Sequence, residues 1–569
     1  MPSPTETAPL HLQTDILVIG AGGAGMMAAL AAAGQGARVL LVDRALIGRG
    51  GATVMAQMTV AVALGSELPD SIAAHFNDTI AAGRGLCDPR LADIVTRDGP
   101  AAIEQLDAWH VGWARHPDGR IRQAHAPGHD KARCVYVDFL NTGPAVSKTL
   151  RAQLQRHENL ITRAGDLMIT DLVTADNAAL GAVGFALSDG RPVSIAAKAT
   201  IIATGGLTRL YRRNSASLNM SGDGYALALR AGAKLIDMEF VQFFPIGHLA
   251  PRMIGMDPIM WDPFRYKLGG RLLNSEGRAF LADYGESADA GYVTTRDQAT
   301  FAILKEVEAG RGSPAGGAWL SFRHIPEEEL RAAFGPVIER LAANGIDLTQ
   351  QDIEVAPIAH YHMGGIQVTP GLLTAVDDLF AAGEAIGGSN GANRLSGNAI
   401  TEALVFGEHT GRAAAARAAT RQVRWSDAAA AAALARVAAT GPARADIAAL
   451  VVELQALMAD KVGPFRNEAG LREALARIGT MREQIGDTPP GQPGPYDMAR
   501  IDWFDLRTML LVAQTVASAA LARTESRGAH QREDFPAMDQ DWTVNQVISL
   551  HGDELEIVTA PVPVLERAA

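Results

Sequence analysis

The chain has 569 residues, of which 48% are hydrophobic and 20% charged, and this predicts a globular protein of about three or four domains. Its net charge of −12 argues against nucleic acid as a partner, because binding to phosphates requires a basic surface. Two cysteines are too few for an iron–sulfur cluster or a disulfide framework, and they fit a reducing compartment. The N-terminal segment lacks the basic start and apolar core of a signal peptide, and we see no apolar run of about 18 residues. We therefore expect a cytoplasmic protein with no membrane span.

Residues 15–43 predict a strand, a helix and a second strand in one βαβ unit. The turn after the first strand contains Gly20, Gly22 and Gly25 in the pattern G-x-G-x-x-G. The first glycine permits the turn, the second lets a pyrophosphate approach the backbone, and the third lets helix and strand pack closely. Asp43 lies 23 positions after Gly20, where an acidic side chain can bind ribose hydroxyls. The unit predicts a dinucleotide site; a turn that only packs the helix is the alternative, and the pattern does not choose between FAD and a nicotinamide nucleotide.

Later segments return apolar strands to this sheet. Residues 198–206 (KATIIATGG) and 378–388 (DLFAAGEAIGG) each predict a buried strand that runs into a glycine turn. Residues 391–412 predict a polar loop followed by a helix. Residues 235–355 lack this pattern and predict an inserted domain, whereas the chain is alanine-rich and helical after about residue 415. The nucleotide-binding domain is therefore expected to be discontinuous.

The segment HYHMGG, residues 360–365, places His360 and His362 two positions apart on a predicted strand. Side chains at this spacing face the same side of a strand, which suits a metal ion. The glycines that follow suit a ligand that must approach the backbone closely. On spacing alone, a metal site, a substrate-anion site and a strand that happens to contain histidines all stay open.

Together these segments resemble the flavoprotein subunits of succinate dehydrogenase and fumarate reductase, a family that includes L-aspartate oxidase and is related to the adenylylsulfate reductase flavoprotein. The shared segments follow one order over most of the chain: VIGAGGAG, ATGG, SGDG at 221–224, RDQATFAI at 296–303, HYHMGG, AAGEAIGGSNGANRLSGNAITEALVFG, and ESRGAHQRED at 525–534. The resemblance implies an α/β fold, with a Rossmann-like FAD-binding domain, an inserted α+β capping domain and a C-terminal helical domain. The expected bounds are 1–234 and 356–415 for the two parts of the FAD-binding domain, 235–355 for the capping domain, and 416–569 for the helical domain and tail.

The resemblance also implies FAD as the cofactor and assigns residues to it. Glu384 and Asp223 would bind the ribityl and adenosine portions, and Ala399 and Ile400 would lie beside the isoalloxazine. The full expected set of cofactor-binding residues is Gly20, Gly22, Gly25, Asp43, Thr53, Asp223, Glu384, Ala399 and Ile400.

For the substrate, the resemblance implies that His360 and Arg394 hold a carboxylate and that Arg296 is a proton shuttle. HYHMGG is then expected to be a substrate-anion site, with His362 as a supporting neighbour, because no third metal ligand with a suitable signature follows. Reduction of an alkene next to a carboxylate builds negative charge on that carboxylate, and Arg394 can bind it through two parallel hydrogen bonds. The pKa of a free arginine is above about 12, so Arg296 would act within a relay, for which Asp297 is a candidate. An ordinary surface ion pair is the alternative for Arg296.

The first departures from the family lie near the expected flavin. Respiratory members carry Ser-His-Thr, with a histidine that bonds the flavin covalently, where this chain has Gly51, Ala52 and Thr53. Alanine cannot form that bond, so we expect non-covalent FAD and, with it, a lower flavin potential that favours alkene reduction. The family's Ala-Gln-Gly-Gly turn reads AQMT here, at residues 56–59.

A further departure concerns the second carboxylate of a dicarboxylate substrate. The family's Gln-Phe-His-Pro-Thr-Gly reads QFFPIG, so Phe244 replaces a histidine, and the Thr-Glu-Gly segment that follows is replaced by a longer loop with Trp261 and Tyr266. A buried carboxylate left unpaired there would cost about 1–3 kcal/mol or more, so we expect a substrate other than fumarate or succinate. Cationic side chains of the new loop (Arg252, Arg265 and Lys267) leave a different diacid open.

Electrons need a route to the flavin. The chain has no second nucleotide pattern and no cysteine set for a cluster, so a separate iron–sulfur or ferredoxin-like subunit, usual in the family, is the expected partner, with NAD(P)H from solution as the alternative. The sequence thus predicts an FAD-dependent oxidoreductase acting on a C–C bond next to a carboxylate. Two other functions stay open: an amino-acid oxidase resembling L-aspartate oxidase, and a flavin subunit that only transfers electrons. Retention of Arg296, His360 and Arg394 argues against the last, because electron transfer alone requires none of them.

Overall fold

The computed structural model describes residues 9–138, 140–253, 259–261, 265, 268–284 and 296–565. Its largest sheet has the strand order β6-β2-β1-β9-β8-β7, with β16 also paired to β9. The strands β6, β2, β1, β9 and β16 run parallel, whereas β8 and β7 are antiparallel additions. Their bounds are β1 (Leu10–Ile19), β2 (Val39–Val42), β6 (Ile161–Ala164), β7 (Leu167–Ala175), β8 (Ala178–Ala186), β9 (Pro192–Ile202) and β16 (Leu379–Ala381). This is the predicted parallel α/β sheet. The two later segments that were expected to return to it, 198–206 and 378–388, contribute to β9 and β16.

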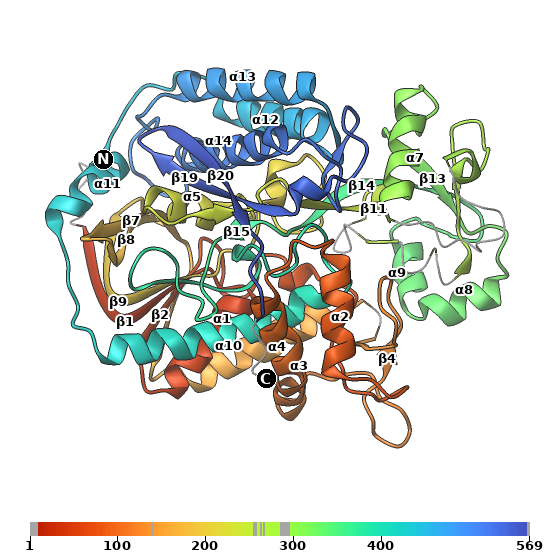
Figure 1. Cartoon of the computed structure of the whole chain (residues 1–569), viewed down its shortest axis with the longest axis horizontal. Helices are drawn as coiled ribbons and strands as arrows, with labels where there is room; N and C mark the ends of the chain where they lie inside the picture. Colours follow the sequence, from red (N-terminus) through yellow and green to blue (C-terminus); the bar gives the residue numbers. More distant parts are fainter. Residues whose placement is uncertain are drawn as a thin grey trace.

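Two helices of small residues pack against each other beneath this sheet (Figure 1). Helix α1 (Gly23–Gly34) joins β1 to β2, and α10 (Asn398–Ala419) crosses it. A Cβ atom on Gly407 would lie 2.6 Å from the Ala24 carbonyl oxygen, and one on Gly411 would lie 2.3 Å from the Ala28 carbonyl oxygen. The glycines therefore allow the two backbones to approach more closely than side chains would permit. The first turns of α1 and α10 both line the cavity described below, so the contact between the two helices sets the position of these parts of its wall.

The capping region lies at the right in Figure 1 and has its own sheet and core. Strands follow the order β11-β14-β13-β12 and are all antiparallel. The bounds are β11 (Val241–Ala250), β12 (Arg271–Leu273), β13 (Ala318–Ser321), β14 (Ile353–His362), α7 (Arg296–Glu308), α8 (Glu327–Phe334) and α9 (Val337–Ala343). This mixture of helices and strands is the expected α+β insertion, and we propose the bounds 235–355 for it.

The chain after residue 415 forms helices, as the alanine-rich composition predicts. They are α11 (Asp427–Ala438), α12 (Ile447–Lys461), α13 (Glu468–Ile485) and α14 (Met498–Ala522). Among the described residues, α14 alone is long and apolar enough to cross a membrane, but 78% of its most apolar window is buried inside the protein. It packs against α5, α12 and α13, as the central helix of a folded core does.

A β-hairpin that was not expected from the sequence follows these helices. Strands β19 (Val544–His551) and β20 (Glu554–Pro561) pair antiparallel, and β19 joins β10 (Leu235–Ile236), which also pairs with β15 (Gly365–Ile366). The turn between β19 and β20 contains Gly552 at φ +64°, a conformation that glycine adopts readily. The C-terminal region is thus joined by strand pairing to the first residues of the proposed insertion and, through them, to β15, and it is not purely helical.

The remaining described elements are short strands and connecting helices. They are α2 (Ile72–Ala82), α3 (Pro89–Ala108), α4 (Thr142–Arg156), α5 (Asp223–Arg230), β3 (Thr59–Ala61), β4 (Gln123–Ala124), β5 (Cys134–Tyr136), β17 (Phe465–Arg466) and β18 (Gln531–Arg532).

Candidate cofactor and substrate site

A cavity of about 1250 Å³, including the solvent at its mouth, opens at the carboxyl ends of the parallel strands. Ile19 and Val42 end β1 and β2, and Ala203 and Ala382 follow β9 and β16; all four line the cavity. The crevice at the carboxyl ends of such strands is where open α/β sheets bind nucleotides. The first turn of α10 and strand β14 of the capping region close the other side.

The glycine turn after β1 is shaped by close backbone contacts. Gly20 has φ +101°, and a Cβ atom there would lie 2.5 Å from the Ala203 carbonyl oxygen. A Cβ atom on Gly25 would lie 1.8 Å from the Gly20 carbonyl oxygen, so helix and turn require glycine at both positions. Gly22 lines the cavity, and a Cβ atom there would meet no atom within 4 Å. The backbone of Gly22 is therefore open to a large anionic group at the start of α1.

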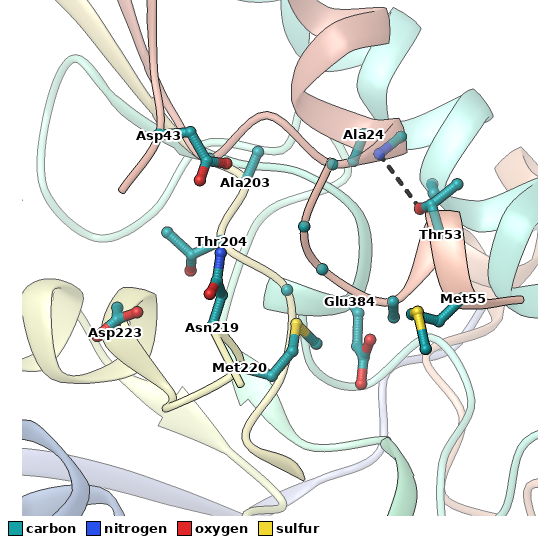
Figure 2. A pocket seen from close by; sticks show the side chains of 18 of the residues that line it. Ala24, Asp43, Thr53, Met55, Ala203, Thr204, Asn219, Met220, Asp223 and Glu384 are labelled. Atoms are coloured by element: carbon teal, nitrogen blue, oxygen red, sulfur yellow. Dashed lines mark hydrogen bonds between the residues drawn. The ribbon is translucent and has the colours of Figure 1, made fainter. Parts of the chain in front are cut away.

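Two side chains brace this turn (Figure 2). The Asp43 carboxylate accepts hydrogen bonds from the backbone N–H groups of Ala21, at 2.7 Å, and Ala45, at 2.8 Å. Thr53 Oγ1 accepts one from Gly23 N at 3.2 Å. Burial raises the pKa of Asp43 above its ordinary value, although the two N–H groups oppose this. Asp43 therefore supports the turn and also presents an acidic side chain to the cavity.

Two further acidic groups face the cavity from separate elements (Figure 2). Burial raises the pKa of Glu384 to about 8, so its carboxyl group is mainly protonated at neutral pH and can donate a hydrogen bond. Glu384 Oε1 accepts from the backbone N–H of His362 at 3.1 Å. Burial also raises the pKa of Asp223, at the start of α5, to about 6. Glycine backbone and acidic groups around one cavity together fit the sugar and phosphate chain of a dinucleotide.

His360 occupies a β-bulge at the cavity wall. In the β11–β14 pairing, Gln242 opposes Tyr361 and Phe243 opposes Ala359, so His360 is an extra residue on β14. Bulges redirect a side chain beside an active site. His360 Nδ1 lies 2.8 Å from Ser215 Oγ, and the His360 side chain lines the cavity. Ser215 was not expected from the sequence, because its contact with His360 spans 145 residues and no local pattern marks it.

The expectation that the two histidines of HYHMGG share one side of a strand is wrong for this bulged segment. His362 is fully buried, and its ring nitrogens lie 3.0 Å from the Tyr225 hydroxyl and 3.1 Å from the Met238 carbonyl oxygen. His360 instead contacts Ser215. Within the part of the chain that the structure describes, no group of three or more His, Cys, Asp or Glu side chains is arranged to hold a metal ion.

Arg394 lies beside the cavity, against a residue of its wall. Its Nη2 donates to Gln242 Oε1 at 3.1 Å, and its Nη1 donates to the Leu395 carbonyl oxygen at 3.1 Å. The guanidinium lies 4.4 Å from the ring centroid of Tyr361, which lines the cavity. Gln242 also donates to the Arg394 carbonyl oxygen at 3.0 Å. This glutamine, the first residue of the QFFPIG segment and one to which the sequence assigned no role, therefore fixes both the backbone and the side chain of Arg394.

Phe244 lies against the ring of His360, with 5.4 Å between the two ring centroids and an edge-to-face arrangement. It forms an apolar cluster with Met260 and Ile358, against which Met58 packs. Met260 also lines the cavity. An apolar group is therefore present beside His360, made partly by residues that were not expected there: Met58, Met260 and Ile358.

The other predicted substrate residues lie elsewhere or outside the described part. Trp261 is fully buried in the core of the capping region, between Phe322 and Phe334, and its Nε1 donates to His248 Nδ1 at 3.1 Å. It packs in the capping core and not in the apolar cluster beside His360, so we leave it out of the substrate pocket proposed below. Tyr266 lies outside the described residues, and Arg296 is the first residue of α7, with a side chain outside the description.

Comparison with known proteins agrees with this geometry. The family model described as FAD binding domain matches residues 15–400, and the model described as fumarate reductase flavoprotein C-term matches residues 452–566. One of the subunits of fumarate reductase (CoM/CoB) from Methanothermobacter marburgensis is 34% identical over 535 residues, which cover 93% of this chain and 96% of the relative. L-aspartate oxidase of Caulobacter vibrioides is 34% identical over 527 residues, which cover 92% and 94%.

Solved structures give the same result. Mycobacterium smegmatis Sdh1 in complex with UQ1 superposes with a TM-score of 0.88 at 35% identity, covering 98% of this chain and 95% of the other. The resemblance inferred from the sequence segments is thereby confirmed, together with the fold class and the cofactor. The chain binds FAD and belongs to the succinate dehydrogenase and fumarate reductase flavoprotein family of FAD-dependent oxidoreductases.

Proposed function

We propose that this oxidoreductase reduces, or forms, a C–C double bond next to a carboxylate, and that fumarate and succinate are poor substrates. The observation that carries the proposal is that His360 lines the cavity that holds the cofactor-facing residues, while Arg394 lies beside that cavity against the ring of Tyr361, which also lines it. Both side chains are fixed by neighbours, Ser215 and Gln242, before any substrate arrives. Fixed donors of this kind stabilise the charge that develops on a carboxylate during the reaction.

The roles that we propose for the protein follow from these positions. Bound FAD supplies the two-electron chemistry. Arg394 binds the substrate carboxylate, and His360 adds a hydrogen bond to it. Arg296, at the start of α7, moves the proton to or from the neighbouring carbon.

The other end of the substrate would meet the apolar cluster of Phe244, Met260, Ile358 and Met58. These side chains offer no hydrogen bond to a second carboxylate, and a buried unpaired charge is strongly unfavourable. We therefore propose an unsaturated or saturated monocarboxylate with an apolar body as the substrate class.

The experiment that tests the reaction class is an anaerobic assay with reduced viologen as electron donor. Viologen oxidation should follow addition of α,β-unsaturated monocarboxylates, and the saturated acid should appear as product by mass spectrometry. A parallel reaction with L-aspartate in air addresses the second candidate, an amino-acid oxidase, which the 34% identity to L-aspartate oxidase supports. Hydrogen peroxide from L-aspartate, without reduction of any unsaturated acid, would replace our proposal with that one.

The electron partner is also part of the proposal. Two relatives, from Methanothermobacter marburgensis and Escherichia coli, are named as subunits of fumarate reductases, and these names make them parts of larger assemblies. We propose a separate iron–sulfur or ferredoxin-like protein as partner and a cytoplasmic location. We likewise propose the division 1–234, 235–355, 356–415 and 416–569 for the first FAD-binding part, the capping insertion, the second FAD-binding part and the C-terminal region.

Non-covalent attachment of FAD is the first testable prediction. Ala52 lines the cavity at the position expected to attach the flavin, and its methyl group can form no bond to the cofactor. Acid precipitation of the purified protein should leave the yellow colour in the supernatant. Flavin fluorescence that stays with the polypeptide on a denaturing gel would contradict the prediction.

A further inference from the structure

A buried carboxylate from the C-terminal region lies at the cofactor cavity. Asp505 belongs to α14, an apolar core helix, and it is fully buried. Charged side chains in such positions are rare unless they are paired. Its partner Arg44 follows Asp43 directly in the chain and lines the cavity. The pair therefore joins two segments that are 461 residues apart.

The contact between Arg44 and Asp505 is bidentate. Arg44 Nη2 donates to Asp505 Oδ2 at 2.8 Å, and Arg44 Nη1 donates to Asp505 Oδ1. Asp505 Oδ2 also accepts a hydrogen bond from Arg209, which is itself bonded to Ser221 at 3.3 Å. Arg209 thus fixes the Asp505 carboxylate, and the carboxylate fixes the orientation of the Arg44 guanidinium. A guanidinium has five N–H donors, so three remain on Arg44 after both bonds to Asp505.

The charges around this contact support a permanent ion pair. Burial alone would raise the pKa of Asp505, but Arg44 and Arg209 outweigh it and hold the pKa below its ordinary value. The same carboxylate raises the pKa of Arg44 against the opposing effect of burial. Asp505 is therefore ionised at neutral pH, where its carboxylate holds Arg44.

The position of Arg44 in the cavity defines what it can meet. It lies close enough to Asp43 and Asp223 for both carboxylates to act on its charge, and Leu167 at the start of β7 donates a backbone hydrogen bond to Asp43 at 3.0 Å. Asp43 follows β2 at the position where acidic residues bind ribose. An arginine here faces the adenosine diphosphate portion of a dinucleotide, whose phosphates and planar ring both suit a guanidinium.

We propose that Asp505 is a positioning residue of the FAD site, which holds Arg44 against the adenosine diphosphate portion so that helix α14 completes cofactor binding. A fixed guanidinium loses less conformational freedom on binding than a mobile one does, and the ion pair therefore raises affinity for FAD without touching it. FAD binding and docking of the C-terminal region depend on each other through this contact.

A double-mutant cycle on the FAD-free protein tests the proposal. FAD dissociation constants, measured by quenching of flavin fluorescence, are compared for wild type, Arg44→Met, Asp505→Asn and the double variant. Each single variant should weaken binding by about tenfold or more, and the double variant should bind no more weakly than Arg44→Met, because Asp505 acts through Arg44. Independent, additive losses, or unchanged affinity in Arg44→Met, would overturn the proposal.

Two further measurements separate positioning from general damage. Gln514→Ala is the control on α14, because Gln514 accepts a hydrogen bond from Arg482 at 3.0 Å and no described contact joins it to Arg44, Arg209 or Asp505; it should bind FAD as wild type does. Competition by adenosine diphosphate should weaken by the same factor as FAD in Asp505→Asn, since only that portion meets Arg44. Equal affinity for adenosine diphosphate in wild type and variant would contradict the assignment. If Asp505→Asn is not recovered folded, Arg44→Lys replaces it in the test. Lysine keeps the positive charge but lacks the planar guanidinium with its paired N–H groups. Wild-type affinity of Arg44→Lys for FAD and adenosine diphosphate would refute the proposal.

Discussion

Arg394→Lys is expected to lower kcat/KM for the carboxylate substrate by about 100- to 1000-fold, while the protein keeps its FAD. Lysine retains the charge, but it cannot hold Gln242 and the Leu395 carbonyl oxygen and still present two parallel N–H groups to a carboxylate. Arg394 is 4% exposed, so the shorter contact surface of lysine would also leave buried polar atoms unpaired. FAD content should not change, because Arg394 does not line the cofactor cavity.

Arg412→Lys is the matched control for this prediction. Arg412 lies on α10, its side chain is 63% exposed, and it pairs with Glu408 four residues earlier. The measurement is steady-state kinetics with the flavin content of each preparation determined separately. Wild-type kcat/KM in Arg394→Lys, or equal losses in both variants, would remove Arg394 from the substrate site.

Arg296→Ala is expected to lower kcat by about 100- to 10,000-fold, which nearly abolishes turnover, and to leave FAD bound at wild-type stoichiometry. The variant removes the proposed proton shuttle at the start of α7, and the resemblance assigns Arg296 no contact with the cofactor. Lys305→Ala on the same helix is its control, since Lys305 pairs with Glu308 and Glu533 at the surface and should be replaceable without loss of kcat. Turnover of Arg296→Ala at the wild-type rate would show that another group delivers the proton.

Glu384 gives the opposite pattern and so distinguishes cofactor residues from catalytic ones. Glu384→Ala should weaken FAD binding itself, because it removes a side chain that faces the cavity. Glu384→Gln should largely retain FAD, because an amide can donate a hydrogen bond as the protonated carboxyl does. A loss of FAD from Arg296→Ala, or full retention in Glu384→Ala, would contradict the two assignments.

The features that the sequence predicts well are those set by neighbouring residues. The turn between β1 and α1 depends on Gly20 and Gly25, whose lack of a Cβ is required by contacts within a few residues of the turn or with the adjacent strand β9. The buried strands β9 and β16 are marked by short apolar runs that end in glycine. The absence of a histidine at Ala52 and at Phe244 is likewise visible from the chain alone, once the resemblance has aligned the segments.

The features that the sequence hides depend on pairing between distant segments. The bulge at His360 arises from the register of β14 against β11, and it separates His360 from His362 although they lie only two positions apart. Ser215 and Gln242 take their roles only from that arrangement. The pattern around Trp261 is that of any aromatic residue near a ligand, and only the fold shows that it packs in the capping core. The hairpin of β19 and β20 was overlooked because the helical composition before it dominated the interpretation.

The nature of the substrate's far end is the central claim, and Phe244 is the residue that tests it. Phe244→His would restore a polar ring 5.4 Å from that of His360 and within the cluster of Met260 and Ile358. It should shift preference toward fumarate, although weakly, because the rest of the family's second carboxylate site is still missing. Phe243→His is the control, since Phe243 packs against Tyr211, at 5.1 Å between ring centroids, and not in that cluster.

The most direct measurement is the ratio of kcat/KM for fumarate to that for a larger unsaturated monocarboxylate, with reduced viologen as donor. Apolar pockets distinguish substrates of different size by only about 1–3 kcal/mol. A site that offers no hydrogen bond to a buried carboxylate should reject a dicarboxylate far more strongly than that. We therefore expect a ratio well below one in the wild type and in Phe243→His, and a higher ratio in Phe244→His. Efficient reduction of fumarate by the wild type, at a rate equal to or above that of the monocarboxylate, would contradict the account, because it would mean that the capping loop supplies a second carboxylate site.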